Sequence, residues 1–494
     1  MSKRVAVIGL DGMPWHVLNR LFEYNAMPNL KRIIKNSLRG ILKSTVPPWT
    51  PPAWTSIATG VNPGKHGIFS FVKLTNDYNS RILNSGDVRY PRIYEMLALL
   101  GLKSVSINLP LTSPIAKIKG TTVISDWMSP NLTFYPKSIK KYAKSYHPYI
   151  ISHLHKAPNY FHRLLKESSS RVDAVNSMME ELDWDLFLVI YSEPDNIMHE
   201  DYRGLINNRN EIALKILNKI DETIREAVRL SDLVLILSDH GFSEFNYLIS
   251  VNTLLYNLGL AFKTWRGSSV EKIVDHASGE KGAIKRIQVP VRLYGLLSFK
   301  PLKLLLKRIF RLLSGRELRA RLPGVNIKDS TAFYLFQFKG IWVKDQKLID
   351  PLIRIIKNIE GIKSVWRREE LFHGPYISLA PHIVLSPDYD NGYQLHSSSI
   401  YPKLIMKTTV YDHHPHGIFI AYGREVSPGW AGEINCEDVV PTILNYLELP
   451  IPSDTDGKII NGISFSPKKV RYYNYLNHWL LTRQLHKLKH KLKI

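Results

Sequence analysis

The chain has 494 residues, of which 44% are hydrophobic and 22% are charged, and its formal net charge is +23. This composition excludes a disordered chain, and the length suits roughly two to four domains with a large buried core. The positive charge predicts an anionic partner, such as a phosphorylated substrate, a nucleic acid or an acidic membrane surface. The alternative is a lysine-rich surface that serves solubility.

Two features indicate the cellular compartment. The single Cys436 excludes an intramolecular disulfide and favours a reducing cytoplasm. The first residues lead directly into a strand pattern without the apolar stretch of a secretory signal, and no run approaches about 18 apolar residues. We therefore expect a cytoplasmic protein without a membrane span.

Apolar runs alternate with helical patterns along most of the chain. Buried strands are predicted at residues 4–10, 104–108, 186–191, 233–237 and 417–421. Helical spacing lies between them, as at residues 27–36, 92–100 and 211–229. This alternation indicates an α/β fold with a mainly parallel central sheet flanked by helices. Ligands of such sheets bind beyond the carboxyl ends of the strands.

Residues 252–391 break this alternation. They contain the basic helical segment 300–321, with eight Lys or Arg and one Glu, and then a strand-like stretch at residues 333–344. We expect an inserted cap region that covers one side of the core and returns near residues 380–385. The core would then comprise residues 1–251 and 392–466.

Residues 467–494 form a basic amphipathic tail. Between Lys468 and Lys493 the chain has eight Lys or Arg and no acidic residue. A helix of this kind either packs its apolar side on the core or lies on an anionic membrane. For the tail we expect peripheral contact with an anionic membrane or another polyanion. The sequence contains no specific nucleic-acid-binding motif.

Carboxylates and imidazoles gather where the predicted strands begin or end. They are Asp11, Asp195, His199, Asp239, His240, His413, His414 and His416. Each has an ordinary explanation alone, such as a turn, a helix cap or a surface pair. Several at one sheet edge are better explained by metal binding, because buried polar groups are costly unless they are paired or metal-bound. Three carboxylates and three imidazoles suit two cations such as Zn²⁺.

A reacting oxygen is expected in the segment STVPPWTPPAWTSIATG. Its candidates are Thr45, Thr50, Thr55, Ser56 and Thr59. Thr50 is followed by two prolines, which restrict the backbone and present a hydroxyl rigidly. Thr50 also suits the cap of a helix that starts near Pro51, and helix N-termini attract phosphate.

An ordered set of motifs resembles the alkaline phosphatase superfamily, in particular its type I phosphodiesterase/nucleotide pyrophosphatase family. The set comprises TPPAWTSIATG, NPGKHGI, EPDNIMH, SDHG and VVPTILNYLELPIPSDTDG. The resemblance implies an alkaline-phosphatase-like core with two divalent metal ions, Zn²⁺ or alternatively Mn²⁺. It implies that Asp195, His199 and His413 hold one metal, with His414 and His416 as alternatives to His413. The other metal would be held by Asp11, Asp239, His240 and the Thr50 hydroxyl.

The implied reaction is hydrolysis of a phosphodiester or pyrophosphate bond through a phospho-threonine at Thr50. The sequence departs from the family at Phe71, where nucleotide pyrophosphatases have an asparagine that helps to hold the phosphoryl oxygens. A backbone N–H or Lys65 is the candidate replacement. The alternatives are another phosphohydrolase of the superfamily (a phosphomonoesterase, phosphonate hydrolase or phosphomutase) and a non-catalytic protein that binds membranes or polyanions.

Overall fold

A computed structural model describes residues 3–75, 78–129, 131–146, 159–264, 324–463 and 470–492. Within these residues the largest sheet has nine strands, in the order β20-β2-β19-β9-β1-β8-β5-β6-β7. Their bounds are β1 Val5–Leu10, β2 Leu38–Lys43, β5 Ser104–Ile107, β6 Thr121–Ile124, β7 Phe134–Tyr135, β8 Leu186–Tyr191, β9 Leu233–Leu237, β19 His416–Gly423 and β20 Gly429–Asn435. Every residue of β1, β8 and β9 is buried, as expected for parallel strands that are covered on both faces.

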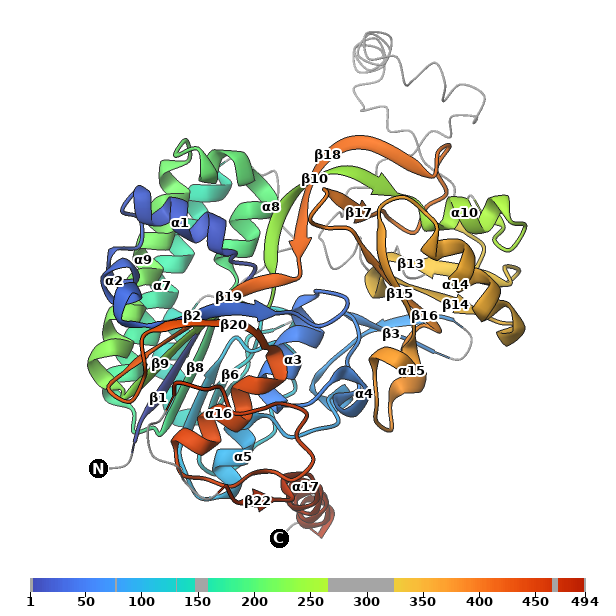
Figure 1. Ribbon diagram of the computed structural model, residues 1–494. Coiled ribbons are helices and arrows are strands. Elements are labelled where there is room, and N and C mark those ends of the chain that lie inside the picture. The colour runs from blue at the N-terminus through green and yellow to red at the C-terminus, as the bar shows by residue number, and fades with distance from the viewer. Residues whose placement is uncertain are drawn as a thin grey trace, which may run out of the picture.

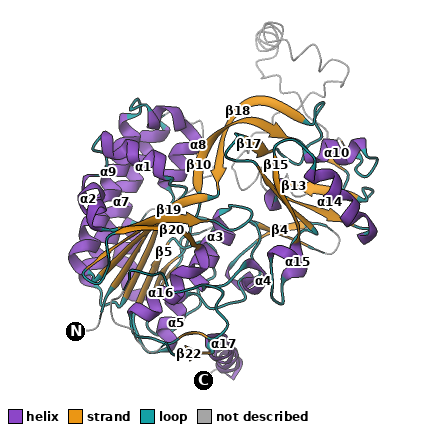
Figure 2. Cartoon of the chain, in the orientation of Figure 1, coloured by secondary structure: helices purple, strands orange, loops and turns teal. Residues whose placement is uncertain are grey.

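Strand direction decides which chain segments meet at one edge of this sheet. Strand β1 is parallel to both of its neighbours, β8 and β9. Strand β19 lies between β2 and β9 and is antiparallel to both. The carboxyl ends of β1, β8 and β9 therefore share an edge with the amino end of β19. Figure 2 shows the strands of this sheet in orange, with purple helices beside them. The predicted mainly parallel sheet is confirmed, and the strand after the histidine cluster enters it in the opposite direction.

Helices cover both faces of the sheet (Figure 1). One face packs against α1 Trp15–Glu23, α2 Pro28–Ile33, α7 Tyr160–Glu181, α8 Glu193–Ile206 and α9 Glu211–Leu230. The other face packs against α3 Thr50–Thr59, α5 Ile93–Leu99 and α16 Val439–Tyr446. Alternate residues of β1 serve the two cores, because side chains of a strand point to opposite faces: Ala6 and Ile8 lie in the first, Val5 and Val7 in the second.

A second sheet with its own hydrophobic core forms the cap (Figure 1). Its strands, in the order β13-β14-β16-β15, are β13 Ala332–Leu335, β14 Gly340–Val343, β15 Ile362–Arg367 and β16 Ile383–Pro387. The helices α10 Val251–Asn257, α14 Ile349–Lys357 and α15 Arg368–Leu371 belong to the same region. The basic segment 300–321 lies outside the described residues.

A three-stranded sheet joins the cap to the core. It consists of β10 Gly241–Ile249, β17 Tyr393–Leu395 and β18 Ile405–His414, with β10 in the middle. Strand β10 leaves the core and β18 runs antiparallel to it on the way back (Figure 1). The return predicted near residues 380–385 is wrong, because β16 pairs with β14 and β15 inside the cap.

Shorter elements include α4 Pro63–His66, β3 Val72–Leu74, β4 Ser80–Ile82, α6 Lys140–Ser145, β11 Lys263–Thr264, β12 Gly324–Val325, β21 Ile451–Pro452 and β22 Tyr472–Tyr473. Helix α17 Tyr475–Leu492 begins on the core, next to α5, with Tyr475 and Trp479 buried. Among the described residues, no helix has the length and apolar character needed to cross a membrane.

Candidate metal centre and active site

Six predicted ligands meet at the edge of the sheet where β1, β8 and β9 end and β19 begins. They follow β1 and β9, occupy the first two turns of α8, or lie near the end of β18: Asp11, Asp195, His199, Asp239, His240 and His413. Strand β19 is antiparallel to β2 and β9. Residues that precede β19 therefore lie at the same sheet edge as residues that follow the parallel strands β1, β8 and β9. The fold therefore explains why the histidines precede their strand.

Asp195, His199 and His413 form the first ligand group. The Nε2 atoms of the two histidines are 3.0 Å apart. The distances from the Asp195 carboxylate oxygens are 3.5 Å to His199 Nε2 and 3.4 Å to His413 Nε2. Ligand atoms about 2.1 Å from one tetrahedral zinc ion lie roughly 3.4 Å from each other. The spacing of this group therefore fits a single cation.

The second group centres on His240. Its Nε2 atom lies 3.6 Å from Asp11 Oδ1, 3.4 Å from Asp239 Oδ2 and 3.3 Å from Thr50 Oγ1. Asp195 also has an oxygen close to the Asp11 and His240 donors, so it lies between the two groups. The Thr50 hydroxyl thus lies beside His240, which in turn lies close to Asp11 and Asp239, the other two residues that the resemblance assigns to the same metal.

The carboxylates of this cluster have oxygens without hydrogen-bond donors. Asp11 Oδ1, Asp195 Oδ1 and Asp239 Oδ2 are buried and accept no hydrogen bond in the described structure. Burial, together with the charges of Asp239 and Asp195, raises the pKa of Asp11 well above its ordinary value, and burial likewise raises the pKa of Asp239. Unpaired buried carboxylates are costly without a counterion. The donor set therefore fits divalent cations.

Two of the imidazole rings, those of His240 and His413, are oriented by hydrogen bonds to backbone carbonyl oxygens. The Nδ1 atom of His240 lies 3.0 Å from the carbonyl oxygen of Gly241, and that of His413 lies 3.0 Å from the carbonyl oxygen of Pro48. A proton on each Nδ1 donates to these carbonyls and leaves the Nε2 lone pair facing the cluster. Burial lowers the pKa of His240 to about 3, so this ring is neutral, which is the form that binds metals.

The turn after β1 requires glycine. Gly12 has a φ of +70°, and its backbone N–H donates to Asp239 Oδ1 at 3.3 Å. A Cβ atom on this residue would lie 2.7 Å from Asp195 Oδ1. Glycine therefore allows the backbone of this turn to approach the carboxylates of both ligand groups closely.

Thr50 differs from the other candidate nucleophiles in what its hydroxyl contacts. The hydroxyls of Thr45, Thr55 and Thr59 donate to backbone carbonyl oxygens, and Ser56 pairs with His66. Thr50, at the first position of α3, has its hydroxyl on the ligand cluster. Of the five candidates, Thr50 is thus the one whose hydroxyl contacts a residue of the ligand cluster.

Comparison with known proteins gives the family. The sequence model of the type I phosphodiesterase/nucleotide pyrophosphatase family matches residues 5–309, which is more than half of the chain. The chain belongs to this family. The resemblance inferred from the motifs is thereby confirmed, and membership indicates a phosphohydrolase of the alkaline phosphatase superfamily. A search of curated proteins found no match.

Solved structures with the same fold extend over almost the whole chain. Alkaline phosphatase PafA has a TM-score of 0.55 at 15% identity and covers 94% of this chain and 99% of its own. Phosphonoacetate hydrolase from Sinorhizobium meliloti 1021, solved with phosphonoformate, has a TM-score of 0.54 at 15% identity, covering 85% and 90%. Murine ectonucleotide pyrophosphatase/phosphodiesterase 5 has a TM-score of 0.51 at 15% identity, covering 92% and 98%. The alkaline-phosphatase-like fold is confirmed.

The position of the family asparagine is apolar here. The ring of Phe71 packs against Trp49 and Trp127, with centroid distances of 6.3 and 6.0 Å. The candidate replacement, Lys65, is engaged elsewhere: its Nζ lies 2.5 Å from Asp456 Oδ1 and 2.6 Å from the Asp454 carbonyl oxygen. These contacts do not favour Lys65 as the phosphate donor.

The two alternative histidines also point to other partners. His414 Nε2 lies 3.8 Å from Asp390, and His416 Nε2 lies 4.0 Å from Glu433. Neither belongs to the groups of donors that approach one another closely enough to share an ion. Of the three residues, His413 is the one placed beside Asp195 and His199.

A buried lysine of the cap lies behind the active site, and the sequence patterns did not indicate it. Lys339 is fully buried, and its Nζ donates to Gln394 Oε1 at 2.8 Å and lies 5.0 Å from the Trp49 ring centroid. Gln394 Nε2 in turn donates to the backbone carbonyl oxygen of His413 at 3.3 Å. Lys339 thus connects the cap, through Gln394, to the backbone of His413, a predicted metal ligand, and it also lies beside Trp49, the residue before Thr50.

Replacing Lys339 by methionine is expected to stabilise the protein at neutral pH. Burial lowers the pKa of Lys339 from its ordinary value of 10.5 to about 8, so the folded state holds this proton less tightly than the unfolded state. The free-energy cost of burying the charged Lys339 is fully present below about pH 8 and disappears as the pH rises to about 10.5. The free energy of unfolding of the wild-type protein therefore increases over this pH range. Lys339→Met should raise the free energy of unfolding at pH 7 by up to about 3 kcal/mol and lose this pH dependence.

Urea unfolding at pH 7 and pH 10 measures this effect. The exposed Lys215→Met on α9 is the control, because it changes the same charge without removing a buried cation. A Lys339→Met protein less stable than wild type at pH 7 would contradict the prediction. The contacts of Lys339 with Gln394 and the aromatic rings would then outweigh its desolvation.

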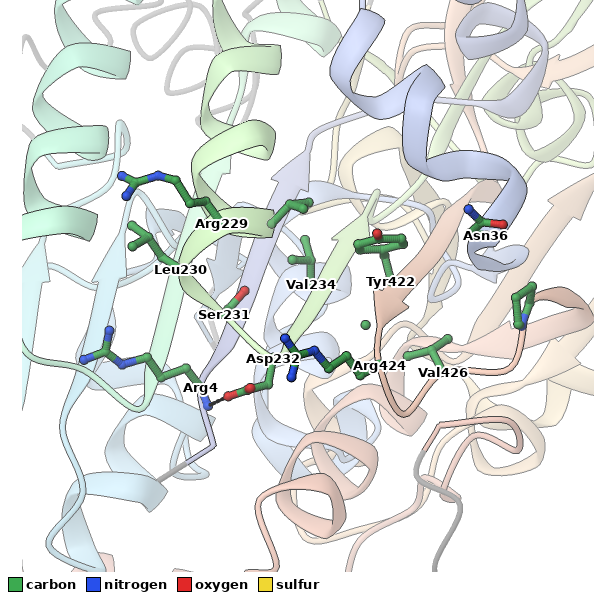
Figure 3. Close-up of a pocket in the computed structure, with 13 residues that line it drawn as sticks. Arg4, Asn36, Arg229, Leu230, Ser231, Asp232, Val234, Tyr422, Arg424 and Val426 are labelled. Atoms are coloured by element: carbon green, nitrogen blue, oxygen red, sulfur yellow. Dashed lines mark hydrogen bonds between the residues drawn. The ribbon is translucent and has the colours of Figure 1, made fainter. Parts of the chain in front are cut away.

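One cavity in the described part of the chain lies away from the ligand cluster. It has a volume of about 880 Å³ and is lined by the amino ends of β1 and β9, the end of α9 and the end of β19. Figure 3 shows Arg4, Arg229, Arg424 and Asp232 on its wall, with the backbone N–H of Arg4 donating to Asp232. It therefore lies at the sheet edge opposite the candidate metal centre, and no histidine lines it.

Proposed function

We propose that the protein is a metal-dependent hydrolase of phosphodiester or pyrophosphate bonds, with Thr50 as nucleophile and two divalent cations, Zn²⁺ or alternatively Mn²⁺. The observation that carries the proposal is the position of the Thr50 hydroxyl, 3.3 Å from His240 Nε2, beside six candidate carboxylate and imidazole ligands. Buried carboxylate oxygens without donors support the presence of cations at this position. Family membership supports the reaction class.

The reaction would proceed in two displacements. When bound, the cations lower the pKa of a hydroxyl and neutralise charge on phosphoryl oxygens. Thr50 Oγ1 attacks the phosphorus in line, so that its bond to phosphorus forms while the bond to the leaving oxygen breaks. Water then hydrolyses the phospho-threonine: its oxygen stays on the released phosphate group, and Thr50 regains a proton. The prolines after Thr50 hold the attacking oxygen in a fixed direction.

Phe71, which stands at the position of the family asparagine, supports a second candidate function. Without the family asparagine, the site lacks one amide donor that nucleotide pyrophosphatases use for the phosphoryl group. Another phosphohydrolase activity of the superfamily, on a phosphomonoester or a phosphonate, is the alternative. Comparing kcat/KM for a chromogenic phosphodiester with that for the corresponding monoester and a phosphonate decides between them, and no turnover of any of the three would favour a non-catalytic binding protein.

Chelation is expected to abolish activity. Purified protein should contain about two zinc ions per chain, lose turnover after treatment with a chelator, and regain it when zinc or manganese is added. Elemental analysis and a phosphodiester assay measure both quantities on one sample. Full activity in protein from which all metal has been removed would refute the proposed mechanism.

A further inference from the structure

Helix α17 is anchored to the core along one side. Tyr475 is fully buried and Trp479 is 3% exposed. The Tyr475 hydroxyl donates to the carbonyl oxygen of Pro450 at 2.7 Å, and the Arg483 guanidinium lies 4.4 Å from the centroid of the Trp479 ring. The first part of the tail is therefore held in a fixed position. On this side, the helix packs against the core, which is one of the two possibilities that the sequence left open for the tail.

The other side of α17 exposes leucines. Leu480 is 43% exposed, and Leu481 and Leu485 are each 58% exposed. Tyr472, just before the helix, is 65% exposed. Among the described residues ten large apolar side chains are exposed, and four of them lie in this short stretch. Single exposed apolar residues are ordinary, but a cluster of them marks a surface that binds a partner.

The positive charge of this segment favours an anionic partner. Eight Lys or Arg and no acidic residue lie between Lys468 and Lys493. In the sequence, Leu488 and Leu492 continue the helical spacing of Leu481 and Leu485, with lysines between them. A second copy of the helix would bring like charges together. A nucleic acid backbone would neutralise the lysines but would leave the leucines in water.

We propose that α17 docks on an anionic lipid surface. Its exposed leucines enter the boundary between headgroups and acyl chains, and its basic residues lie among the lipid phosphates. The anchored side of the helix, with Tyr475 and Trp479, keeps the rest of the protein attached at a defined place. This inference does not depend on the proposed reaction, because lipid binding is measured without turnover.

Vesicle co-sedimentation tests the apolar part of the proposal. Vesicles of phosphatidylglycerol and phosphatidylcholine in equal parts should bind the wild-type protein, and vesicles of phosphatidylcholine alone should not. The double variant Leu481→Asn/Leu485→Asn should bind the anionic vesicles at least about tenfold more weakly. Ile355→Asn, at an exposed position on α14, is the matched control and should bind like wild type.

Salt and lysine variants test the charged part. Lys487→Gln/Lys491→Gln should weaken binding about fivefold per lysine at low salt, and raising the salt concentration should reduce the difference. Lys215→Gln on α9 is the matched control. All variants should hydrolyse a small soluble phosphodiester like wild type and unfold at the same temperature.

Four outcomes would overturn the proposal. The first is wild-type vesicle binding by the double leucine variant, and the second is equal binding of wild type to neutral and anionic vesicles. The third is a change of oligomeric state in the leucine variant without a change in vesicle binding, as measured by analytical ultracentrifugation, which would assign this surface to a second copy of the chain. Binding to heparin without binding to vesicles would assign the basic residues to a polyanion and likewise refute lipid docking.

Discussion

Replacement of Thr50 by alanine is expected to lower kcat by at least about 10³-fold, because the attacking oxygen is lost while the ligand groups remain. This loss corresponds to about 4 kcal/mol in the activation free energy. Thr50→Ser keeps the hydroxyl without the methyl group and should retain part of the activity. Steady-state kinetics on a chromogenic phosphodiester, with metal content determined on the same samples, measures the effect.

Thr55→Ala is the matched control for Thr50→Ala. It removes the same atoms from the same helix, but the Thr55 hydroxyl donates only to the Pro51 carbonyl oxygen. Its kcat should stay within a few-fold of wild type. A Thr50→Ala protein with near wild-type kcat would show that water, not Thr50, attacks the phosphorus. Loss of metal in Thr50→Ala would instead indicate that the hydroxyl contributes mainly to metal affinity.

The ligand variants are expected to separate into two classes. Asp195→Asn, His199→Ala and His413→Ala should empty one metal position, and the metal content should fall from two ions to one. Replacement of Asp11, Asp239 or His240 should empty the other position. Each ligand replacement should reduce kcat/KM more than about 100-fold, since losing a partner that only orients a ligand already costs 10–100-fold. Anomalous scattering from crystals of each variant identifies the position that is lost.

His414→Ala is the control for this series. His414 is adjacent to His413 but lies against Asp390, so its removal should leave both metals in place. If His414→Ala empties a position and His413→Ala does not, the assignment of this ligand is wrong by one residue. Because Asp195 lies between the two groups, loss of both metals in Asp195→Asn would show that its carboxylate bridges them.

The sequence predicted those parts of the structure that depend on local patterns. Residues 186–191 and 233–237 are continuous apolar runs, and they form β8 and β9 with these bounds. The ends of parallel strands share one edge, so the polar residues after these runs could be expected near Asp11 without knowledge of the strand order. The six candidate ligands were therefore predicted from local spacing, from the rule that ligands bind at the carboxyl ends of parallel strands, and from the resemblance to the family.

Long-range pairing limited the rest of the prediction. Lys65 is a plausible phosphate donor until Asp456, far along the chain, is seen beside it. Lys339 resembles any lysine in a strand-rich segment, and only the folded cap brings it to Gln394 and Trp49. The return to the core was predicted too early, near residues 380–385, because the sequence pattern does not reveal that strand β16 pairs inside the cap sheet.

The position of β19 has a consequence for how the protein is made. This strand lies inside the nine-stranded sheet, with Ile418 paired to Ile41 and Ile420 to Ile236, although it is translated only after the whole cap. Until then the nascent chain exposes the unpaired edge of β9, to which other chains can pair, and β2 has no place in the sheet. His413 lies at the end of β18, just before β19, so we expect the first ligand group to be completed only when β19 inserts. We therefore expect closure of the sheet and completion of this ligand group to coincide in folding, and ribosome-bound chains that end before β19 to aggregate more readily than the full chain.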